Sequence, residues 1–256
     1  QLVKDHGVKV LLGARNRERG AAAVQAVKEH CGSDSAAIEH VLLDVADDDS
    51  VRTAVASLTK KGIRIDAIVN NAACGYAEGT DPAEIINTNL MGHKRVVENC
   101  MPLFVEEGAR IINVGSGFGP GYVKEQSMEW QKILCSPDVT WQQIEQIRDG
   151  PLVDPKTTYR MCKALLASYT LYCAKKYPRI MSFCITPGKV DTPKAKGYDG
   201  AKKPSQGTVS IRHCLFKAEK EQSGWYFGSD AQRSPLHFLR NPGEPAFDGV
   251  YPWEET

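Results

Sequence analysis

Tyr159 and Lys163 stand four positions apart in a run, residues 156–169, that contains no Pro or Gly. Apolar residues recur in this run at helical spacing, so we expect a helix with both side chains on one face. A free phenol has a pKa near ~10, and a nearby ammonium lowers that pKa because it favours the phenolate. The pair therefore predicts a general acid for a developing alkoxide. A single Tyr-x-x-x-Lys is, however, more often a packed Tyr beside a solvated Lys.

Basic residues follow the first predicted strand. Arg15, Arg17 and Arg19 come directly after it, and no acid stands at the strand tip. In dinucleotide-binding folds an acid at this place binds a free ribose 2′-hydroxyl, whereas Arg accommodates a 2′-phosphate. We interpret Arg15 and Arg19 as phosphate ligands, and Arg17 as part of a solvated helix start. The alternative for all three is that solvated helix start.

Polar and small residues follow the next three strands. Asp44 and Val45 come after the second, and the carboxylate of Asp44 either accepts a hydrogen bond from an adenine amino group or caps the next helix. Asn71 and Ala72 come after the third, where an Asn can brace a turn and a small residue lets the backbone approach a ligand. Ser116 follows the fourth between two glycines, as an exposed hydroxyl or as an ordinary turn Ser.

The elements that must position these residues alternate between strand-like and helix-like segments. This alternation predicts an α/β fold, a doubly wound, Rossmann-like parallel sheet in a single domain over residues 1–256. We expect Asp48 or Asp49 to cap the second helix. Strands are expected at 8–13, 37–43, 65–70, 110–114, 180–185 and 224–228, and helices at 17–30, 49–60, 82–107, around Tyr159 and at 207–218.

Composition narrows the function classes. The net charge is +1, with no long basic run, which argues against nucleic acid or an anionic membrane as a partner. There is no apolar stretch long enough for a transmembrane helix. The eight cysteines include no C-x-x-C pair and no zinc spacing, so we expect reduced thiols, no metal and a cytoplasmic location.

Taken together, the motifs resemble those of the short-chain dehydrogenase/reductase family. Within the family, the basic segment 14–20, the long stretch between Ser116 and Tyr159 and the segment 202–207 are similar to the monomeric carbonyl reductases. The family motifs occur in order as Asn70-Asn71-Ala72-Ala73, Asn87-Thr88-Asn89, Asn113-Val114-Gly115-Ser116, Tyr159-x-x-x-Lys163 and Pro187-Gly188-x-Val190-x-Thr192.

The resemblance implies a role for each motif residue. Tyr159 donates a proton to the substrate carbonyl, Lys163 lowers its pKa and holds the nicotinamide ribose, and Ser116 donates a hydrogen bond to the same oxygen. Asn89 shapes its helix and anchors a water that leads protons to Lys163. NADPH supplies the hydride, and the substrate is a small-molecule ketone, aldehyde or quinone. The implied residues flanking the cofactor are Asn71, Ala72, Pro187, Gly188, Val190 and Thr192.

The segment 117–158 contains two tryptophans and two amphipathic stretches, near 126–134 and 140–147. We interpret it as a helical insertion that forms a wall over the substrate. It would also cover the helical face that related enzymes use to form tetramers, so we expect a monomer. The alternative is a surface excursion with a small core of its own.

The chain also departs from the family pattern. The family opens with a strand and a Thr-Gly-x-x-x-Gly-x-Gly turn, and this chain shows neither, since residues 1–7 resemble the end of the helix that follows that turn. We expect either an N-terminal segment that precedes this numbering or a truncated product. Ala73 stands where the family usually has Gly. Two alternatives to a carbonyl reductase follow: a truncated, non-catalytic NADPH-binding or interaction protein, and an NAD-dependent alcohol dehydrogenase, against which Arg15 and Arg19 argue.

Overall fold

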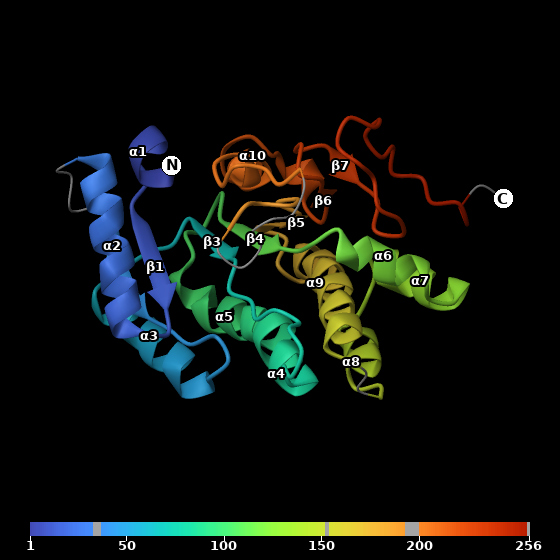
Figure 1. Ribbon diagram of the computed structural model, residues 1–256, viewed down its shortest axis with the longest axis horizontal. Helices are drawn as coiled ribbons and strands as arrows, with labels where there is room; N and C mark the ends of the chain where they lie inside the picture. The colour runs from blue at the N-terminus through green and yellow to red at the C-terminus, as the bar shows by residue number, and fades with distance from the viewer. Residues whose placement is uncertain (33–36, 152–153, 193–199, 255–256) are drawn as a thin grey trace. The chain divides into compact units, whose positions relative to one another are not determined.

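The fold is α/β with mainly parallel strands, as the sequence predicts. The strands form two separate sheets. The computed structural model describes residues 1–32, 37–151, 154–192 and 200–254. These fold into two compact units, one of residues 1–64 with 94–103 and the other of residues 65–93 with 104–256. The first unit holds a two-stranded sheet, and the second a five-stranded sheet (Figure 1).

The first unit is built on β1 (Val10–Ala14) and β2 (Ile38–Leu42), which run parallel. The helix α1 (Leu2–His6) precedes β1 and ends at Gly7, which has a left-handed φ of 62°. The helices α2 (Arg17–Cys31) and α3 (Asp48–Lys60) follow the two strands.

The N-cap of α3 precedes both residues that we predicted, Asp48 and Asp49, so that prediction is wrong. Asp47 caps the helix, because its carboxylate accepts a hydrogen bond from the Ser50 amide at 2.6 Å. Asp47, Asp48 and Asp49 all carry a carboxylate that could cap a helix. Asp47 is the cap because its backbone is extended and it lies directly before the first helical turn.

The second unit contains the remaining strands. β3, β4, β5 and β6 are mutually parallel, and β7 pairs antiparallel with β6. In the described part of the chain β1 pairs only with β2, and β3 pairs only with β4, so β1 and β2 are both edge strands, and β3 is an edge strand of the larger sheet. The bounds are β3 (Ala67–Asn70), β4 (Arg110–Val114), β5 (Met181–Ile185), β6 (Tyr226–Phe227) and β7 (Arg233–Ser234).

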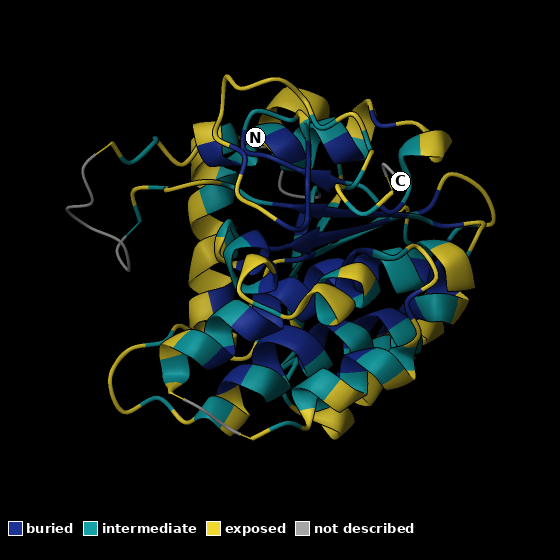
Figure 2. Ribbon diagram, turned by 90° about the vertical axis from the view of Figure 1, so that its right-hand side faces the viewer, coloured by how far each residue is buried: buried dark blue, intermediate teal, exposed yellow. Residues whose placement is uncertain are grey.

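Helices cover both faces of the larger sheet. The long helix α9 (Pro155–Lys176) packs on β4 and β5 from one side, and α10 (Val209–Phe216) packs on them from the other. The pleat of β5 divides its side chains accordingly: Cys184 joins the core around α9, whereas its neighbour Phe183 joins the core around α10. Buried residues line the sheet and the inner faces of these helices (Figure 2).

The predicted helix at 82–107 is interrupted. It consists of α4 (Pro82–Ile86), a π-helical turn (Asn87–Met91), α5 (Gly92–Cys100) and a 3-10 turn (Met101–Leu103). Asp81 caps the start of α4, and Pro82 occupies the first helical position. The π-helical turn contains Asn89, so one of the predicted site residues lies where the regular helix breaks.

The insertion 117–158 is helical, as expected for its amphipathic stretches. It contains α6 (Phe118–Lys124), α7 (Met128–Cys135) and α8 (Trp141–Arg148). Buried residues of α7 and α8 share one hydrophobic cluster with α9, and the Trp141 ring lies edge-on to Tyr169 at 5.8 Å. The alternative of a separate small core is therefore wrong.

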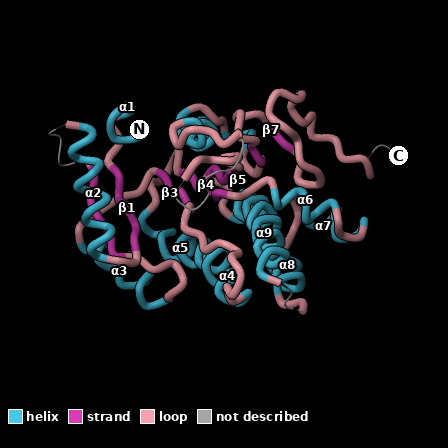
Figure 3. Tube along the Cα trace, in the orientation of Figure 1, coloured by secondary structure: helices cyan, strands magenta, loops and turns pink. Residues whose placement is uncertain are grey.

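The segment after β7 forms loops in its described part, residues 235–254 (Figure 3). Aromatic contacts hold this segment in place. The rings of Tyr251 and Trp253 stack at 4.9 Å and pack against the cluster that contains α9. No helix among the described residues is long and apolar enough to cross a membrane.

Candidate active site

The helix α9 places Tyr159 and Lys163 side by side, as the spacing predicts. Asp154 caps this helix through the Lys156 and Thr157 amides, and Pro155 occupies its first position. The Lys163 ammonium is buried, and its Nζ donates a hydrogen bond to the Val114 carbonyl oxygen at 2.7 Å, at the end of β4. Its Nζ lies 5.6 Å from the centroid of the Tyr159 ring.

The pKa of Tyr159 shifts in the direction opposite to our prediction. Burial, with smaller contributions from Tyr76, Cys74 and Cys162, raises the pKa of the Tyr159 phenol to about 12. Burial also lowers the pKa of Lys163 to about 8. Desolvation disfavours the charged form of both groups and is the largest cause of both pKa shifts. At neutral pH Tyr159 is therefore a fully protonated phenol.

Ser116 lies where β4 gives way to α6. Its Oγ accepts a hydrogen bond from the Phe118 amide at 3.3 Å, which leaves the hydroxyl hydrogen available to another acceptor. The next turn approaches α9 closely, since a Cβ on Gly119 would lie 2.9 Å from the Lys163 carbonyl oxygen. The end of β4 thus supplies Ser116 and the carbonyl that holds Lys163.

Three aromatic rings meet at Tyr159, and sequence analysis identified only one of them. The Tyr76 ring centroid is 5.0 Å from that of Tyr159, and the Phe118 ring stands edge-on to both, at 5.9 Å and 6.2 Å. Phe118 is 39% exposed. The signal available in the sequence was an aromatic residue directly after the Gly-Ser-Gly turn at 115–117.

Asn89 binds the backbone of another segment of the same unit. Its side-chain Nδ2 donates to the Cys74 carbonyl at 3.1 Å, and its Oδ1 accepts from the Cys74 amide at 2.9 Å. The fully buried amide thereby holds the segment that leads from Ala72 to Tyr76. Asn71 and Ala72 are exposed on the turn after β3.

His93 was not identified from the sequence. It is buried, and its Nε2 lies 2.8 Å from the Ala72 carbonyl oxygen. Burial, and to a smaller extent the charge of Lys163, lowers the pKa of His93 to about 3. The imidazole is therefore neutral, and because Nε2 faces a carbonyl, Nε2 carries the proton. His93 fixes the position of Ala72.

A buried chain of polar side chains connects three elements beneath these residues. Asn70 at the end of β3 donates to Asn113 on β4 at 2.9 Å, and Asn113 donates to Thr170 on α9 at 2.9 Å. Each link is satisfied, so the chain sets the relative positions of the two strands and the helix. The two Asn residues of the family motifs thus serve the framework.

The turn after β5 contains the predicted cofactor residues Pro187, Gly188, Val190 and Thr192. Gly188 has φ of +75°, a conformation that favours glycine. Val190 forms an isolated parallel bridge with Lys202, whose Nζ donates to Ser229 at 2.8 Å. Pro187 and Thr192 are partly buried. The described part of this loop ends at Thr192 and resumes at Gly200.

Arg15, Arg19, Asp44 and Val45 belong to the first unit, whereas the other predicted site residues belong to the second. Arg15 and Arg19 are exposed after β1, and in the described part of the chain neither guanidinium has an ion-pair partner. The N-cap alternative for Asp44 is wrong, because Asp47 caps α3. The Asp44 carboxylate accepts from the Ala46 amide at 3.0 Å instead, within its own turn.

A close packing contact lies beside Arg15 and Arg19, the proposed phosphate ligands. A Cβ on Gly20 would lie 2.2 Å from Nε2 of His40, so glycine is needed where α2 crosses β2. The His40 ring in turn lies 3.3 Å from the Ala14 carbonyl, directly before Arg15. Val45 accepts a hydrogen bond at its carbonyl from Arg95 at 2.6 Å.

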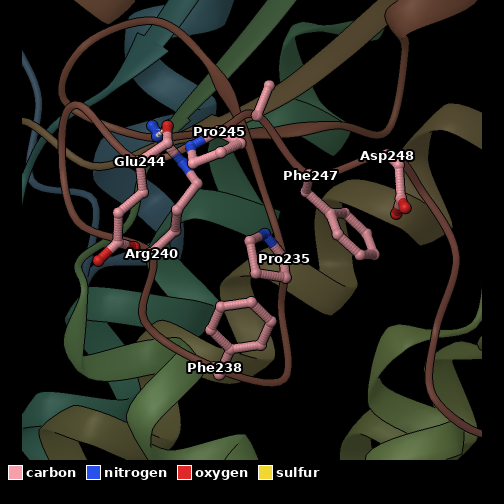
Figure 4. A pocket seen from close by; sticks show the side chains of 8 residues that line it. Pro235, Phe238, Arg240, Glu244, Pro245, Phe247 and Asp248 are labelled. Carbon is pink, nitrogen blue, oxygen red and sulfur yellow. Dashed lines mark hydrogen bonds between the residues drawn. The ribbon is translucent and has the colours of Figure 1, made fainter.

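Two pockets formed by described residues are lined by other residues than the predicted catalytic ones. One, of about 330 Å³, is lined only by the segment after β7, including Phe238, Arg240 and Phe247 (Figure 4). The Arg240 guanidinium of this pocket already donates hydrogen bonds to Asp230, Ser234 and the Glu244 carbonyl oxygen. Another, of about 390 Å³, is lined by α2, β2 and α3. No cluster of three His, Cys, Asp or Glu side chains that could hold a metal occurs among the described residues.

Comparison with known protein families gives one family assignment. A family model described as short chain dehydrogenase matches residues 1–128. A (+)-neomenthol dehydrogenase from Arabidopsis thaliana is 30% identical over 86% of this chain and 88% of its own length. Carbonyl reductase [NADPH] 1 from Sus scrofa is 29% identical over 57% of this chain and 51% of its own length.

Solved structures agree on the fold. The menthone neomenthol reductase from Mentha piperita has a TM-score of 0.72 at 22% identity, over 89% of this chain and 92% of that one. The NADPH-bound carbonyl reductase from chicken fatty liver has a TM-score of 0.63 at 17% identity, over 88% of this chain and 86% of that one. At these identities the structural likeness concerns the fold alone.

Proposed function

The chain belongs to the short-chain dehydrogenase family of oxidoreductases, and on that premise we propose that it reduces a ketone, aldehyde or quinone carbonyl to an alcohol with NADPH. The observation that carries the proposal is the pairing of Tyr159 with Lys163 on α9, beside the strand end that bears Ser116. The relatives named above include an NADPH carbonyl reductase, which supports the same reaction class.

The donor chemistry of the chain fits a phosphorylated dinucleotide. Arg15 and Arg19 present exposed guanidiniums after β1, and guanidinium forks suit a phosphate. Asp44 follows β2 in the same unit. In the second unit, Asn71, Ala72 and the turn at Pro187, Gly188, Val190 and Thr192 are the residues that we propose for contacts with the cofactor. When bound, NADPH would supply the hydride.

Residues of α9 and of the turn after β4 would donate the proton and stabilise the developing negative charge. Tyr159 stays protonated at neutral pH because its pKa is raised to about 12. It still transfers its proton readily, because an alkoxide is a far stronger base than a phenolate. The ammonium of Lys163, held by the Val114 carbonyl, stabilises the phenolate that remains. The free hydroxyl hydrogen of Ser116 donates to the same carbonyl oxygen as negative charge develops there.

The test is the variant Tyr159→Phe, measured with NADPH and a panel of carbonyl compounds. Phe keeps the ring and its packing against Tyr76, so the fold and the NADPH affinity should stay within a few fold of the parent. Loss of general acid catalysis should lower the rate by ~10²–10⁴-fold. A variant that retained more than about a tenth of the parent rate would place the proton donor elsewhere. A parent that binds NADPH but reduces no carbonyl would favour the non-catalytic alternative.

We also propose that the chain is a monomer. Residues of α7 and α8 pack onto α9, and Trp141 contacts Tyr169 and Tyr172 of that helix. A helix face that is covered from within the chain is not free to pair with a second copy. Light scattering at micromolar concentration measures this directly, and a tetramer would contradict it.

A further inference from the structure

An apolar wall stands beside the Tyr159 ring. Tyr76, Phe118 and Tyr159 are in mutual contact, with ring centroids 5.0, 5.9 and 6.2 Å apart. Leu239, from the segment after β7, lies against the backbone of Gly117, since a Cβ there would be 2.9 Å from its Cδ1. Phe118 is 39% exposed and Leu239 is 52% exposed. Side chains of this size normally turn inward, so their joint exposure beside a candidate proton donor needs a reason.

The wall is tied to the residues that would act on the carbonyl. The Phe118 amide donates to Ser116 Oγ, so the residue that carries the exposed ring also orients the Ser116 hydroxyl. Gly117, on which Leu239 lies, is the residue between them. A carbonyl carbon held at Tyr159 and Ser116 would therefore place its substituents against the rings of Phe118 and Tyr76.

The groups around the Tyr159 hydroxyl are uncharged in their ordinary forms. After burial, which is the largest cause of its raised pKa, the groups that influence the Tyr159 hydroxyl are the Tyr76 phenol and the thiols of Cys74 and Cys162. The nearby cation, Lys163, already donates to the Val114 carbonyl. Arg160, the next residue after Tyr159, pairs with Glu125 at 2.6 Å. A carboxylate or phosphate on the substrate would meet apolar rings there, and none of these described residues offers it an unpaired cation, so it would lose its hydration.

We propose that Tyr76, Phe118 and Leu239 form the substrate wall, and that the substrate is a neutral carbonyl compound bearing a ring or a comparable apolar body. This inference rests on the proposed function and names its substrate class. Aromatic faces and edges pack well against rings, and the exposed Phe118 edge would be covered when the substrate binds. Small polar aldehydes and keto acids would be poor substrates.

The first test compares matched aldehydes with NADPH. Benzaldehyde and 4-carboxybenzaldehyde share ring and carbonyl and differ by one carboxylate, and propanal lacks the ring. We expect kcat/KM for benzaldehyde to exceed that for either of the others by at least about tenfold, a ratio that apolar pockets reach. Equal values for benzaldehyde and 4-carboxybenzaldehyde would overturn the wall and leave the carbonyl reductase function standing.

Variants separate the wall from general effects on the fold. Phe118→Ala should lower kcat/KM for benzaldehyde about tenfold, mainly through KM, and change the value for propanal much less. Tyr76→Phe keeps the ring and should retain the preference. Phe216→Ala removes an exposed aromatic on α10, 44% exposed, and serves as the matched control. A Phe118→Ala variant that weakens benzaldehyde and propanal equally would overturn the proposal.

A binding measurement tests the wall even if turnover fails. Saturation-transfer NMR with the full chain should detect benzyl alcohol bound in the presence of NADP⁺, and 4-(hydroxymethyl)benzoate much more weakly. Phe118→Ala should reduce the benzyl alcohol signal, whereas Phe216→Ala should not. Selective binding that depends on Phe118, without any carbonyl reduction, would refute the proposed function and support the wall. Binding that does not depend on Phe118 would refute the wall.

Discussion

Gly119 on α6 lies against the backbone of Lys163 on α9, where an added Cβ would come within 2.9 Å of the Lys163 carbonyl oxygen. This contact sets how closely the two helices approach. Ser116 stands three residues before Gly119, and its carbonyl accepts the Gly119 amide at 2.9 Å. The approach of α6 therefore fixes Ser116 relative to the helix that carries Tyr159.

Gly119→Ala should damage both stability and catalysis. The new methyl group meets backbone atoms that cannot rotate away, so the helices must separate, at a cost of roughly 1–3 kcal/mol of unfolding free energy. Carbonyl reduction should fall more than NADPH affinity, because Ser116 moves away from Tyr159. Urea unfolding and steady-state kinetics measure the two effects.

The matched control is Gly121→Ala on the same helix. The nearest atom to a Cβ at Gly121 is a terminal Arg160 nitrogen at 3.7 Å, an ordinary contact with a flexible side chain. Replacing a helical Gly by Ala where the methyl group has room is commonly stabilising by about 0.5–1 kcal/mol. If the two variants behave alike, the close approach at Gly119 does not position Ser116.

Arg15→Ala should weaken NADPH and leave NADH nearly unchanged. The exposed guanidinium of Arg15 follows β1, where a 2′-phosphate would lie in the proposed complex. Loss of a charge-assisted bond costs roughly 1–3 kcal/mol, which fluorescence titration with each cofactor resolves. Arg17→Ala is the control, because we interpret Arg17 as part of the solvated start of α2. Equal losses for NADPH and NADH would contradict the assignment of Arg15.

Many strands and helices were predictable, because apolar runs bounded by Gly, Pro and polar residues indicate such elements in the sequence. β4 occupies the predicted residues, and α9 contains the predicted run around Tyr159. The helix α6 was not predicted, since two glycines and a proline oppose helix formation in Phe118–Lys124. The helix α6 forms because Gly119 allows it to pack on α9. This contact joins residues far apart in the sequence, so no local sequence pattern predicts it.

The site was predictable in its residue types and less so in its electrostatics. Tyr159, Lys163 and Ser116 were identified by spacing, but the direction of the Tyr159 pKa shift depends on burial and, to a smaller extent, on Tyr76, which is distant in sequence. His93 carries no motif, and its role appears only once Ala72 lies 2.8 Å from Nε2. Leu239 reaches Gly117 across more than a hundred residues, beyond any local signal.

His93 should make the chain less stable in acid. Its pKa is lowered to about 3, so below the ordinary value of 6.5 the unfolded chain takes up a proton that the folded chain refuses. The free energy of unfolding therefore falls as pH decreases from 6.5 towards 3, by ~1.4 kcal/mol per pH unit. At pH 5 the contribution is ~2 kcal/mol. Urea unfolding followed by tryptophan fluorescence at pH 7 and pH 5 measures it.

His93→Gln provides the comparison for that loss. Gln can donate to the Ala72 carbonyl in place of Nε2 and does not titrate, so this variant should lose ~2 kcal/mol less than the parent between pH 7 and pH 5. His30→Gln, at an exposed position on α2, should keep the parent's acid dependence. An unchanged difference between pH 7 and pH 5 in His93→Gln would show that His93 is charged in the folded chain.

Carbonyl reduction should decline in alkali through the titration of Lys163. Burial lowers its pKa to about 8, and above that pH the ammonium that favours the phenolate of Tyr159 is lost. Tyr159, with a pKa of about 12, remains protonated throughout and does not contribute. The kcat/KM for an aldehyde should therefore fall as pH rises through about 8, by ~tenfold per unit beyond it, because this parameter reports groups of the free enzyme.

Measurement of kcat/KM from pH 6 to pH 10 tests the assignment, with Cys74→Ala as the control. Cys74 is a partly buried thiol and, like Cys162, lies close enough to influence the pKa of both Tyr159 and Lys163. The alkaline decline should persist in Cys74→Ala, because Lys163 is unchanged. A kcat/KM that is constant to pH 10 would show that the charge of Lys163 is not required. A decline that disappears in Cys74→Ala would assign it to the thiol.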